Sequence, residues 1–345
     1  MDLSDLDLYS LNTTGVPDYY NWSNYEYIEI NYPTYENDAT GDIIRKVTLA
    51  LLSIFFILGI IGNGLVIWIA GFRMKKTISA VWFLHLAIAD LLCCFSLFPI
   101  IILWTNILKI HFRDIIILLC EMMLVITMYT GVLLLTAMSV DRWVSVMWPF
   151  WAKVHRTQKR VRITAGIIWG MSLVWNGFLC LHTFVIPHIN YDNNSIHTFH
   201  LIRLVLLYVI PFLIIFTSYV SIFLKLRKSN RPQRSQRPYR IITAVILCFF
   251  IFWAPYYIYP LIPFDYKVHG IKFYLSFIVP ILIFMKNVIN PIIYVVMGQD
   301  VGHDFPSSIP IRLESALSEA ANDLGQEQEN HELVTTIASE HLTTI

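Results

Sequence analysis

The sequence predicts an all-α membrane protein in which seven helices cross the bilayer as one bundle. Hydrophobic residues make up 56% of the chain and charged residues only 14%, whereas soluble domains contain about 25% charged residues. Seven apolar runs each have the roughly 20 residues that a helix needs to cross the hydrocarbon core. They cover about residues 47–71, 78–104, 115–148, 163–186, 200–224, 241–264 and 271–297. Backbone groups cannot bond to water in lipid, so each run is expected to be helical.

An acidic, tyrosine-rich arm over residues 1–44 precedes the first run. Nine acidic residues come before the first basic residue, Arg45. No helical or strand period is visible there, which predicts an arm without regular structure until a ligand binds. The tyrosines of interest are Tyr19, Tyr20, Tyr25 and Tyr27. Glycosylation sequons begin at Asn12 and Asn21, and a third begins at Asn193 in the loop expected at 187–199.

The distribution of basic residues predicts how the bundle is oriented. Lysine and arginine gather in the loops after the first, third and fifth runs and are sparse in the others. Basic loops face the cytoplasm, which places the N-terminus outside and the C-terminus inside. The seven-helix domain is expected over 45–298 and an acidic, phosphorylatable cytoplasmic tail over 299–345. Prolines at Pro99, Pro211, Pro255 and Pro291 are expected to kink four helices.

Asp90 is a single carboxylate near the middle of the second run. A charge at that depth costs several kcal/mol and faces protein or trapped water. Counting residues from the membrane surface places Asn63, Lys286 and Asn290 at nearly the same depth. Lys286 and Asn290 are four residues apart, so they share a helix face. The pattern predicts one intramembrane polar centre. A neutral Asp90 bonded to a backbone carbonyl is the alternative.

Two further motifs lie at the ends of runs that face the cytoplasm. Asp141-Arg142-Trp143 ends the third run, and Asn290-Pro291 with Tyr294 ends the seventh. Alternatively, Arg142 could have no functional role and could simply extend its charged end to the membrane–water interface. Trp253 lies one turn from the kink expected at Pro255.

The sequence indicates neither a catalytic site nor a metal-binding site. The five cysteines all fall inside apolar runs, which predicts neither a disulfide nor a metal site. The sequence contains no nucleophile–base set and no phosphate-binding loop, so we expect no enzyme, no cofactor and no nucleic-acid partner.

Together these motifs resemble the rhodopsin-like (class A) G-protein-coupled receptors. One marker falls in each run, at the spacing of that family: Gly62-Asn63, Leu86-Ala87-Ile88-Ala89-Asp90, Asp141-Arg142-Trp143, Trp169, Pro211 with Tyr219, Phe249 with Trp253-Ala254-Pro255, and Asn290-Pro291 with Tyr294. The resemblance covers about residues 45–298.

A narrower resemblance is to the chemoattractant receptors for formyl peptides, chemerin and complement anaphylatoxins. The run from Gly62 to Met74 and the tail frame from Met297 to Glu319 are similar to formyl-peptide receptors, while the acidic arm is more similar to the other two groups. Arg203, eight residues before Pro211, matches an arginine that those families share in the ligand pocket.

The chain also departs from the family. Ile117 stands where the family has the first cysteine of an extracellular disulfide, and the loop 187–199 has no partner cysteine. Val301, Asp304 and Pro306 occupy aromatic and basic places of a membrane-parallel helix, which disfavours that helix. Lys286 replaces the usual asparagine.

The resemblance implies a plasma-membrane receptor for a peptide or small-protein chemoattractant, coupled to a Gi-type G protein in inflammatory and immune chemotaxis. The arm tyrosines, Arg203, Glu121 and Tyr256 would bind the ligand, although Arg203 and Glu121 could instead pair with each other. Trp253 would move the sixth helix, and Arg142 would leave Asp141 and open the cytoplasmic face with Tyr219 and Tyr294. Arrestin and receptor kinases would act on the tail, and membrane lipid surrounds the helices.

The sequence leaves two other functions as alternatives. The first is a non-signalling or arrestin-biased scavenger of the same ligands, which the missing disulfide and Lys286 favour. The second is a transporter or channel, which the absence of inverted repeats disfavours. In relatives a sodium ion accompanies the carboxylate at the place of Asp90. We expect the Lys286 ammonium to take the place of that ion.

Overall fold

The computed structural model describes residues 39–74, 77–104, 113–185, 193–228, 237–262 and 269–297, together with 309–310, 313–314 and 317–318 of the tail. Nearly all of these residues are helical. The arm residues Tyr19, Tyr20, Tyr25 and Tyr27 and the sequons at Asn12 and Asn21 lie outside this part of the chain, as does the segment from 298 to 308.

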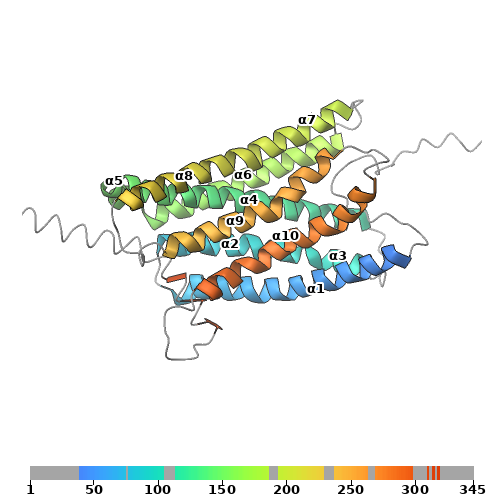
Figure 1. The fold of residues 1–345 in the computed structure, drawn as a ribbon, viewed down its shortest axis with the longest axis horizontal. Helices are drawn as coiled ribbons and strands as arrows, with labels where there is room; N and C mark the ends of the chain where they lie inside the picture. The colour runs from blue at the N-terminus through green and yellow to red at the C-terminus, as the bar shows by residue number, and fades with distance from the viewer. Residues whose placement is uncertain are drawn as a thin grey trace, which may run out of the picture.

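Every predicted apolar run forms a helix, and the long helices lie side by side (Figure 1). In chain order they are α1 (Ala39–Trp68) with the π-helical turn η2 (Ile69–Arg73), α2 (Ile78–Phe95) with α3 (Leu97–Trp104), α4 (Arg113–Met147), α6 (Gln158–Val185), α7 (Asn193–Leu204) with the π-helical turn η4 (Val205–Val209) and α8 (Ile210–Lys228), α9 (Arg237–Ile258) with η6 (Tyr259–Leu261), and α10 (His269–Met297). A short helix, α5 (Pro149–His155), connects α4 to α6. The all-α prediction is confirmed.

Six helical segments of the described chain are long and apolar enough to cross a membrane. The remaining long helix, α6, has 28 residues, and a helix of that length measures about 42 Å. Its composition is less apolar because it begins with Lys159, Arg160 and Arg162, and because Ser172 and Asn176 lie among its aliphatic residues. We refer to the end of the bundle where α1 begins as the arm end, and to the end where α10 finishes as the tail end.

Helix boundaries differ from the predicted ones in two places. α1 begins at Ala39, so the helix includes residues that were assigned to the arm. α7 begins at Asn193, inside the segment that was expected to be a loop. Both extensions project beyond the apolar runs, and hydropathy alone therefore could not locate them.

Part of the tail packs against the helical bundle, although its acidic sequence is typical of a fully solvated segment. Leu313 and Leu317 are only 1% and 0% exposed and belong to the main hydrophobic cluster. Glu314 pairs with Arg73, the last residue of η2, at 2.6 Å between Oε2 and Nε. The two leucines are four residues apart, so one helix face can bury both against the tail end of the bundle.

Two of the irregularities in the helices lie next to prolines. Helix α2 stops at Phe95, and α3 starts at Leu97, close before Pro99. The π-helical turn η4 comes directly before α8, which carries Pro211 in its first turn. Proline at position 211 cannot donate to the carbonyl of Leu207. The Tyr257 hydroxyl lies 3.5 Å from that oxygen and donates to it.

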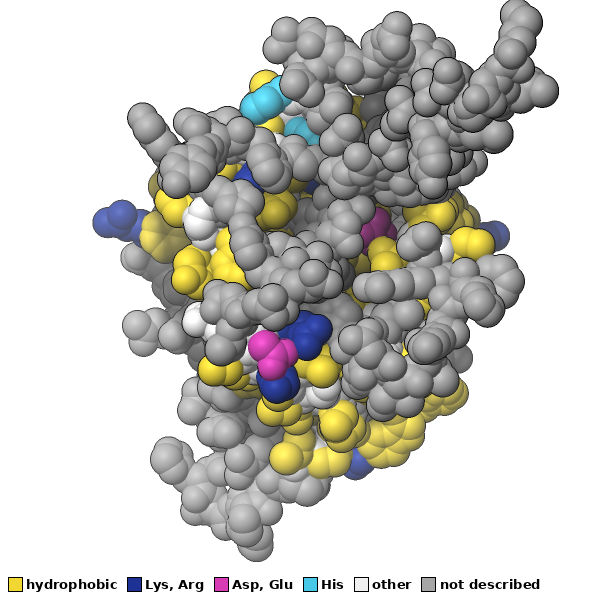
Figure 2. Space-filling model, turned by 90° about the vertical axis from the view of Figure 1, so that its right-hand side faces the viewer, with side chains coloured by type: hydrophobic (Ala, Val, Ile, Leu, Met, Phe, Trp, Pro, Cys, Tyr) yellow, Lys and Arg dark blue, Asp and Glu magenta, His cyan; other side chains and the backbone are white. Residues whose placement is uncertain are grey.

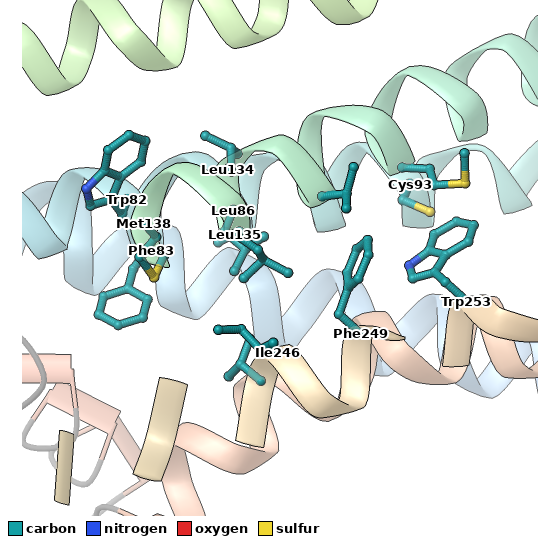
Figure 3. Close-up of a cluster of buried hydrophobic side chains, with 14 of the residues drawn as sticks. Trp82, Phe83, Leu86, Cys93, Leu134, Leu135, Met138, Ile246, Phe249 and Trp253 are labelled. Carbon is teal, nitrogen blue, oxygen red and sulfur yellow. The ribbon is translucent and has the colours of Figure 1, made fainter. Parts of the chain in front are cut away.

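In the centre of the bundle, apolar faces of α2, α4 and α9 meet as part of the core (Figure 3). Phe249 and Trp253 extend from α9 toward α4, where Leu135 and Met138 lie, while Leu86 comes from α2. All five side chains are almost completely buried. This contact places the aromatic residues of α9 next to the helix that carries Asp90.

Candidate functional site

Asp90 is the centre of a buried polar cluster between α2 and α10. The Lys286 ammonium lies 2.5 Å from Oδ1, and the Asn290 amide donates to Oδ2 at 2.6 Å. All three residues are at most 4% exposed. The carboxylate therefore has a charged partner from a helix nearly 200 residues away in sequence. This geometry favours an ion pair over the alternative of a neutral Asp90 bonded to a backbone carbonyl.

Asn63 joins the same region through backbone atoms rather than through Asp90. Its amide donates to the carbonyl of Asn287 and to the carbonyl of Gly59, both at 3.0 Å. Pro291 has no N–H with which to satisfy the carbonyl of Asn287, which precedes it by four residues. Asn63 supplies the missing donor, so α1 stabilises the part of α10 that precedes Pro291.

Close approach of α1 to Pro291 requires glycine at position 62. A Cβ atom added there would lie 2.9 Å from Cγ of Pro291 and 3.1 Å from its Cβ. Real side chains do not approach so closely. Gly62 therefore allows α1 and α10 to pack at the distance that the Asn63 hydrogen bond needs.

A continuous series of contacts joins the polar centre to the arm end. The Lys286 ammonium lies 5.1 Å from the ring centre of Phe249, and the Phe249 and Trp253 rings are 6.0 Å apart. Trp253 meets Tyr256 edge-on at 5.5 Å. The guanidinium of Arg203 lies 4.9 Å from the Tyr256 ring. Cation–π and edge-to-face geometries of this kind are attractive.

Arg203 is a buried cation of the arm end. It is 7% exposed and lies over two aromatic rings of α9, with the Tyr257 ring centre at 5.7 Å. Arg203 and Glu121 both lie within electrostatic range of the Tyr256 hydroxyl, so the three side chains share one region. Figure 2 shows this end of the bundle, where basic, acidic and histidine side chains appear among hydrophobic ones in the described surface.

The tail end carries the Asp141-Arg142 motif. Arg142 is 1% exposed, which excludes the alternative of an arginine that extends away from the protein. It lies within electrostatic range of Tyr219 on α8. Tyr294 belongs to α10, and its side chain lies outside the described part of the structure.

Asp141 has a partner that the sequence did not indicate. Arg156, which directly follows α5, donates to both carboxylate oxygens at 2.7 Å, and the Trp82 indole donates to Oδ2 at 3.2 Å. The prediction considered only Arg142. Arg156 belongs to a loop rich in basic residues, and nothing in the sequence distinguishes it from its neighbours.

Lys225 is a second residue that sequence reasoning missed. Its ammonium donates to the carbonyls of Val146 and Met147 at 2.7 and 3.1 Å. These are the last carbonyls of α4, which have no partner within the helix. A cation at a helix C-terminus is favourable, so Lys225 joins the end of α8 to the end of α4.

Neither a metal nor a disulfide is indicated by the geometry of the described residues. Within that part of the chain no three His, Cys, Asp or Glu side chains come together as a possible metal site. Cys93, Cys94, Cys120 and Cys248 are free thiols, while the side chain of Cys180 is outside the described set.

The spacing of these residues matches a known family. A family model described as "7 transmembrane receptor (rhodopsin family)" matches residues 62–294. The chain belongs to this family. That membership makes it a multi-pass protein of the plasma membrane and a receptor rather than an enzyme.

Curated relatives place it among the chemoattractant receptors. The chain is 32% identical to the C3a anaphylatoxin chemotactic receptor of Danio rerio, over 86% of this chain and 84% of the relative. It is 30% identical to the C5a anaphylatoxin chemotactic receptor 1 of Homo sapiens, over 90% and 92% of the two chains. It is 34% identical to the chemerin-like receptor 1 of Sus scrofa, over 81% and 84%.

Proposed function

We propose that this receptor binds a peptide or small-protein chemoattractant at the arm end and activates a Gi-type G protein at the tail end. The arm end would face the exterior and the tail end the cytoplasm, as the distribution of basic loop residues indicates. The relatives named for C3a, C5a and chemerin support ligands of this class. A ligand of the formyl-peptide type is a further candidate on the sequence resemblance.

The observation that carries the proposal is the series of contacts from Arg203 to Asp90. A ligand carboxylate that binds Arg203 would draw the guanidinium from the Tyr256 ring, which now lies 4.9 Å from it. Tyr256 contacts Trp253, and Phe249 connects Trp253 to Lys286. Movement of α9 would therefore change the environment of the buried ion pair.

The acidic arm would provide a first contact for a basic ligand surface. Tyr19, Tyr20, Tyr25 and Tyr27 lie among its carboxylates, and sulfation would add negative charge. Glycans on Asn12, Asn21 and Asn193 would be compatible with an extracellular position of the arm and of the start of α7. Glu121 would contribute a countercharge near Arg203.

At the tail end, the proposed response involves Arg142, Tyr219 and Tyr294. Arg142 is buried beside α8 in this structure. Opening of the tail end would expose it to a G protein, and Asp141 would retain Arg156 and Trp82 as partners. Receptor kinases and arrestin would act on the serines and threonines of the tail.

A second candidate function is a receptor that recruits arrestin or clears ligand without activating a G protein. The ion pair between Asp90 and Lys286 favours it, because a fixed salt bridge between α2 and α10 resists rearrangement. Asp141-Arg142 and Asn290-Pro291 with Tyr294 favour the signalling receptor instead.

The experiment that tests the binding site uses cells that express the receptor and a panel of anaphylatoxin, chemerin-like and formylated peptides. Peptides with a free C-terminal carboxylate are compared with their amides. Loss of a charge-assisted hydrogen bond costs about 1.5–3 kcal/mol, so Arg203→Ala should raise the EC50 of the acid roughly 10- to 100-fold.

The matched control is Arg45→Ala, which removes an exposed arginine that pairs with Asp42. It should leave the EC50 unchanged. Amidation should weaken the peptide on the native receptor but have little further effect on Arg203→Ala. Equal losses on both receptors would mean that the carboxylate binds elsewhere.

A further inference from the structure

Tyr208, in the π-helical turn η4, contacts α9 on both sides of Pro255. Its ring centre lies 5.2 Å from that of Phe250, in an edge-on contact, and 5.1 Å from that of Tyr257. Phe250 and Tyr257 are seven residues apart, which is about two helical turns, so they share one face of α9. Both side chains are almost completely buried. Tyr208 therefore packs against the segment of α9 before the proline and against the segment after it.

The hydroxyl groups of the two tyrosines form hydrogen bonds in opposite directions. Tyr208 donates from η4 to the carbonyl of Phe250 at 2.9 Å. Tyr257 donates from α9 to the carbonyl of Leu207 at 3.5 Å. Leu207 and Tyr208 are consecutive residues. One turn of η4 is thus connected to α9 twice, once before Pro255 and once after it.

Both accepting carbonyls lie in turns that a proline weakens. Pro211 has no N–H, so it cannot donate to the carbonyl of Leu207. Pro255 likewise removes one hydrogen bond from the preceding turn of α9, and its ring crowds a carbonyl there. Phe250 belongs to that turn. The hydroxyls of Tyr208 and Tyr257 therefore each reach the neighbouring helix where the backbone hydrogen bonds of that helix are incomplete.

The two hydrogen bonds restrict bending of α9 at Pro255. Sharp bends in helices concentrate at proline, so α9 bends most easily at this point. Bending would move residues 237–254 relative to the residues after the proline. Both parts of α9 are held to neighbouring residues of η4, so this movement would stretch the bond between Tyr208 and Phe250. An O–H···O hydrogen bond is lost when its oxygens separate beyond about 3.5 Å. A small outward movement is therefore enough to break it.

The tail end of the bundle is closed in this structure, since Arg142 is only 1% exposed there. We propose that Tyr208 and Tyr257 form a latch that holds α9 in this closed position. The latch opens before the part of α9 on the tail side of Pro255 swings outward. Both tyrosines are positioning residues, because they act through the path of α9. The latch belongs to the receptor alone and requires neither a particular ligand nor a Gi protein.

Opening of α9 is measured by the modification rate of a cysteine that the closed position buries. Ile246 of α9 is 4% exposed and lies in the core (Figure 3). Full-length receptors that carry Ile246→Cys are placed in nanodiscs without ligand or G protein. Their rate of reaction with a charged, water-soluble methanethiosulfonate reports how often α9 opens. Loss of one neutral hydrogen bond shifts such an equilibrium about 2- to 12-fold. Tyr208→Phe should raise the rate by that factor. Tyr257→Phe should raise it less, because its bond is longer, and the double variant should raise it most.

Two controls distinguish a latch from general support of the fold. Tyr274→Phe removes the hydroxyl of a tyrosine that is 53% exposed, and it should leave the rate unchanged. Cys93 of α2 is 2% exposed and lies farther from the tail end than Ile246 (Figure 3). Its modification, mapped by mass spectrometry in the same samples, should stay constant, because bending at Pro255 opens only the tail end. An unchanged or lower rate at Ile246→Cys in the double variant, or an equal rise at Cys93, would overturn the proposal.

Discussion

Replacement of Lys286 by methionine should destabilise the receptor by leaving Asp90 as an unpaired buried carboxylate. The two side chains are 2% and 5% exposed, and the contact measures 2.5 Å. Asn290 would remain as a neutral donor at 2.6 Å. Breaking a buried pair by removing one partner costs about 3–5 kcal/mol. Asp90→Asn should cost a similar amount, since it leaves the ammonium beside the Phe249 ring without its carboxylate.

The double variant Asp90→Asn/Lys286→Met distinguishes the stability that comes from the ion pair from stability lost through the substitutions themselves. It removes both charges, and replacement of a whole buried pair is often nearly neutral. We expect its stability to exceed that of either single variant, which corresponds to a coupling energy of at least about 2 kcal/mol.

Thermal unfolding of the purified receptor in one fixed detergent measures these effects. A loss of 3–5 kcal/mol should lower the Tm of each single variant by roughly 5 °C or more. The double variant should recover most of that loss. If the losses of the two single variants simply add in the double variant, the two residues do not stabilise each other and the account of the polar centre is wrong.

Three further predictions concern sodium and the packing of the helices. Sodium should not change agonist affinity of the native receptor, whereas Lys286→Asn should become sodium-sensitive in radioligand competition, because the ammonium no longer occupies the position beside the carboxylate. Gly62→Ala should lower the Tm, since its Cβ would lie 2.9 Å from the proline ring of α10 and overpacking costs about 1–3 kcal/mol. Arg156→Gln should cost about 1.5–3 kcal/mol in thermal unfolding, because Asp141 loses two charge-assisted hydrogen bonds.

Controls for these variants come from neighbouring positions. An added Cβ at Gly64 meets nothing within 4 Å, so Gly64→Ala should be neutral or stabilise by up to about 1 kcal/mol through helix propensity. Arg160→Gln removes an exposed arginine and should change stability by no more than about 0.5 kcal/mol. A native receptor that responds to sodium, or equal Tm values for Gly62→Ala and Gly64→Ala, would contradict the corresponding prediction.

The sequence predicted the helices and the polar centre because both depend on simple counting. Long apolar runs leave few structures other than helices, and their equal depth in the membrane predicts that Asp90, Lys286 and Asn290 lie close together. The structure confirms that Lys286 and Asn290 share a helix face directed at the carboxylate. Asn63 lies at the expected depth, but its partner is the carbonyl freed by Pro291.

The contacts that sequence reasoning missed depend on the path of the chain between helices. Arg156 reaches Asp141 only because α5 turns the chain back under α4, and no periodicity indicates that turn. Leu313 and Leu317 are buried although the surrounding tail is polar. Their four-residue spacing is typical of a buried helix face, but the polar composition of the tail did not suggest one. The start of α1 at Ala39 reflects helix formation beyond the membrane, which hydropathy does not report.

The most direct test of the account is nucleotide exchange on a Gi protein in membranes that contain the receptor, measured with the anaphylatoxin, chemerin-like and formylated peptides alongside arrestin recruitment. At least one peptide should stimulate exchange on the native receptor, and Arg142→Ala, at equal surface expression, should abolish it. Arrestin recruitment by such a peptide without any nucleotide exchange would contradict the signalling function and favour the scavenger.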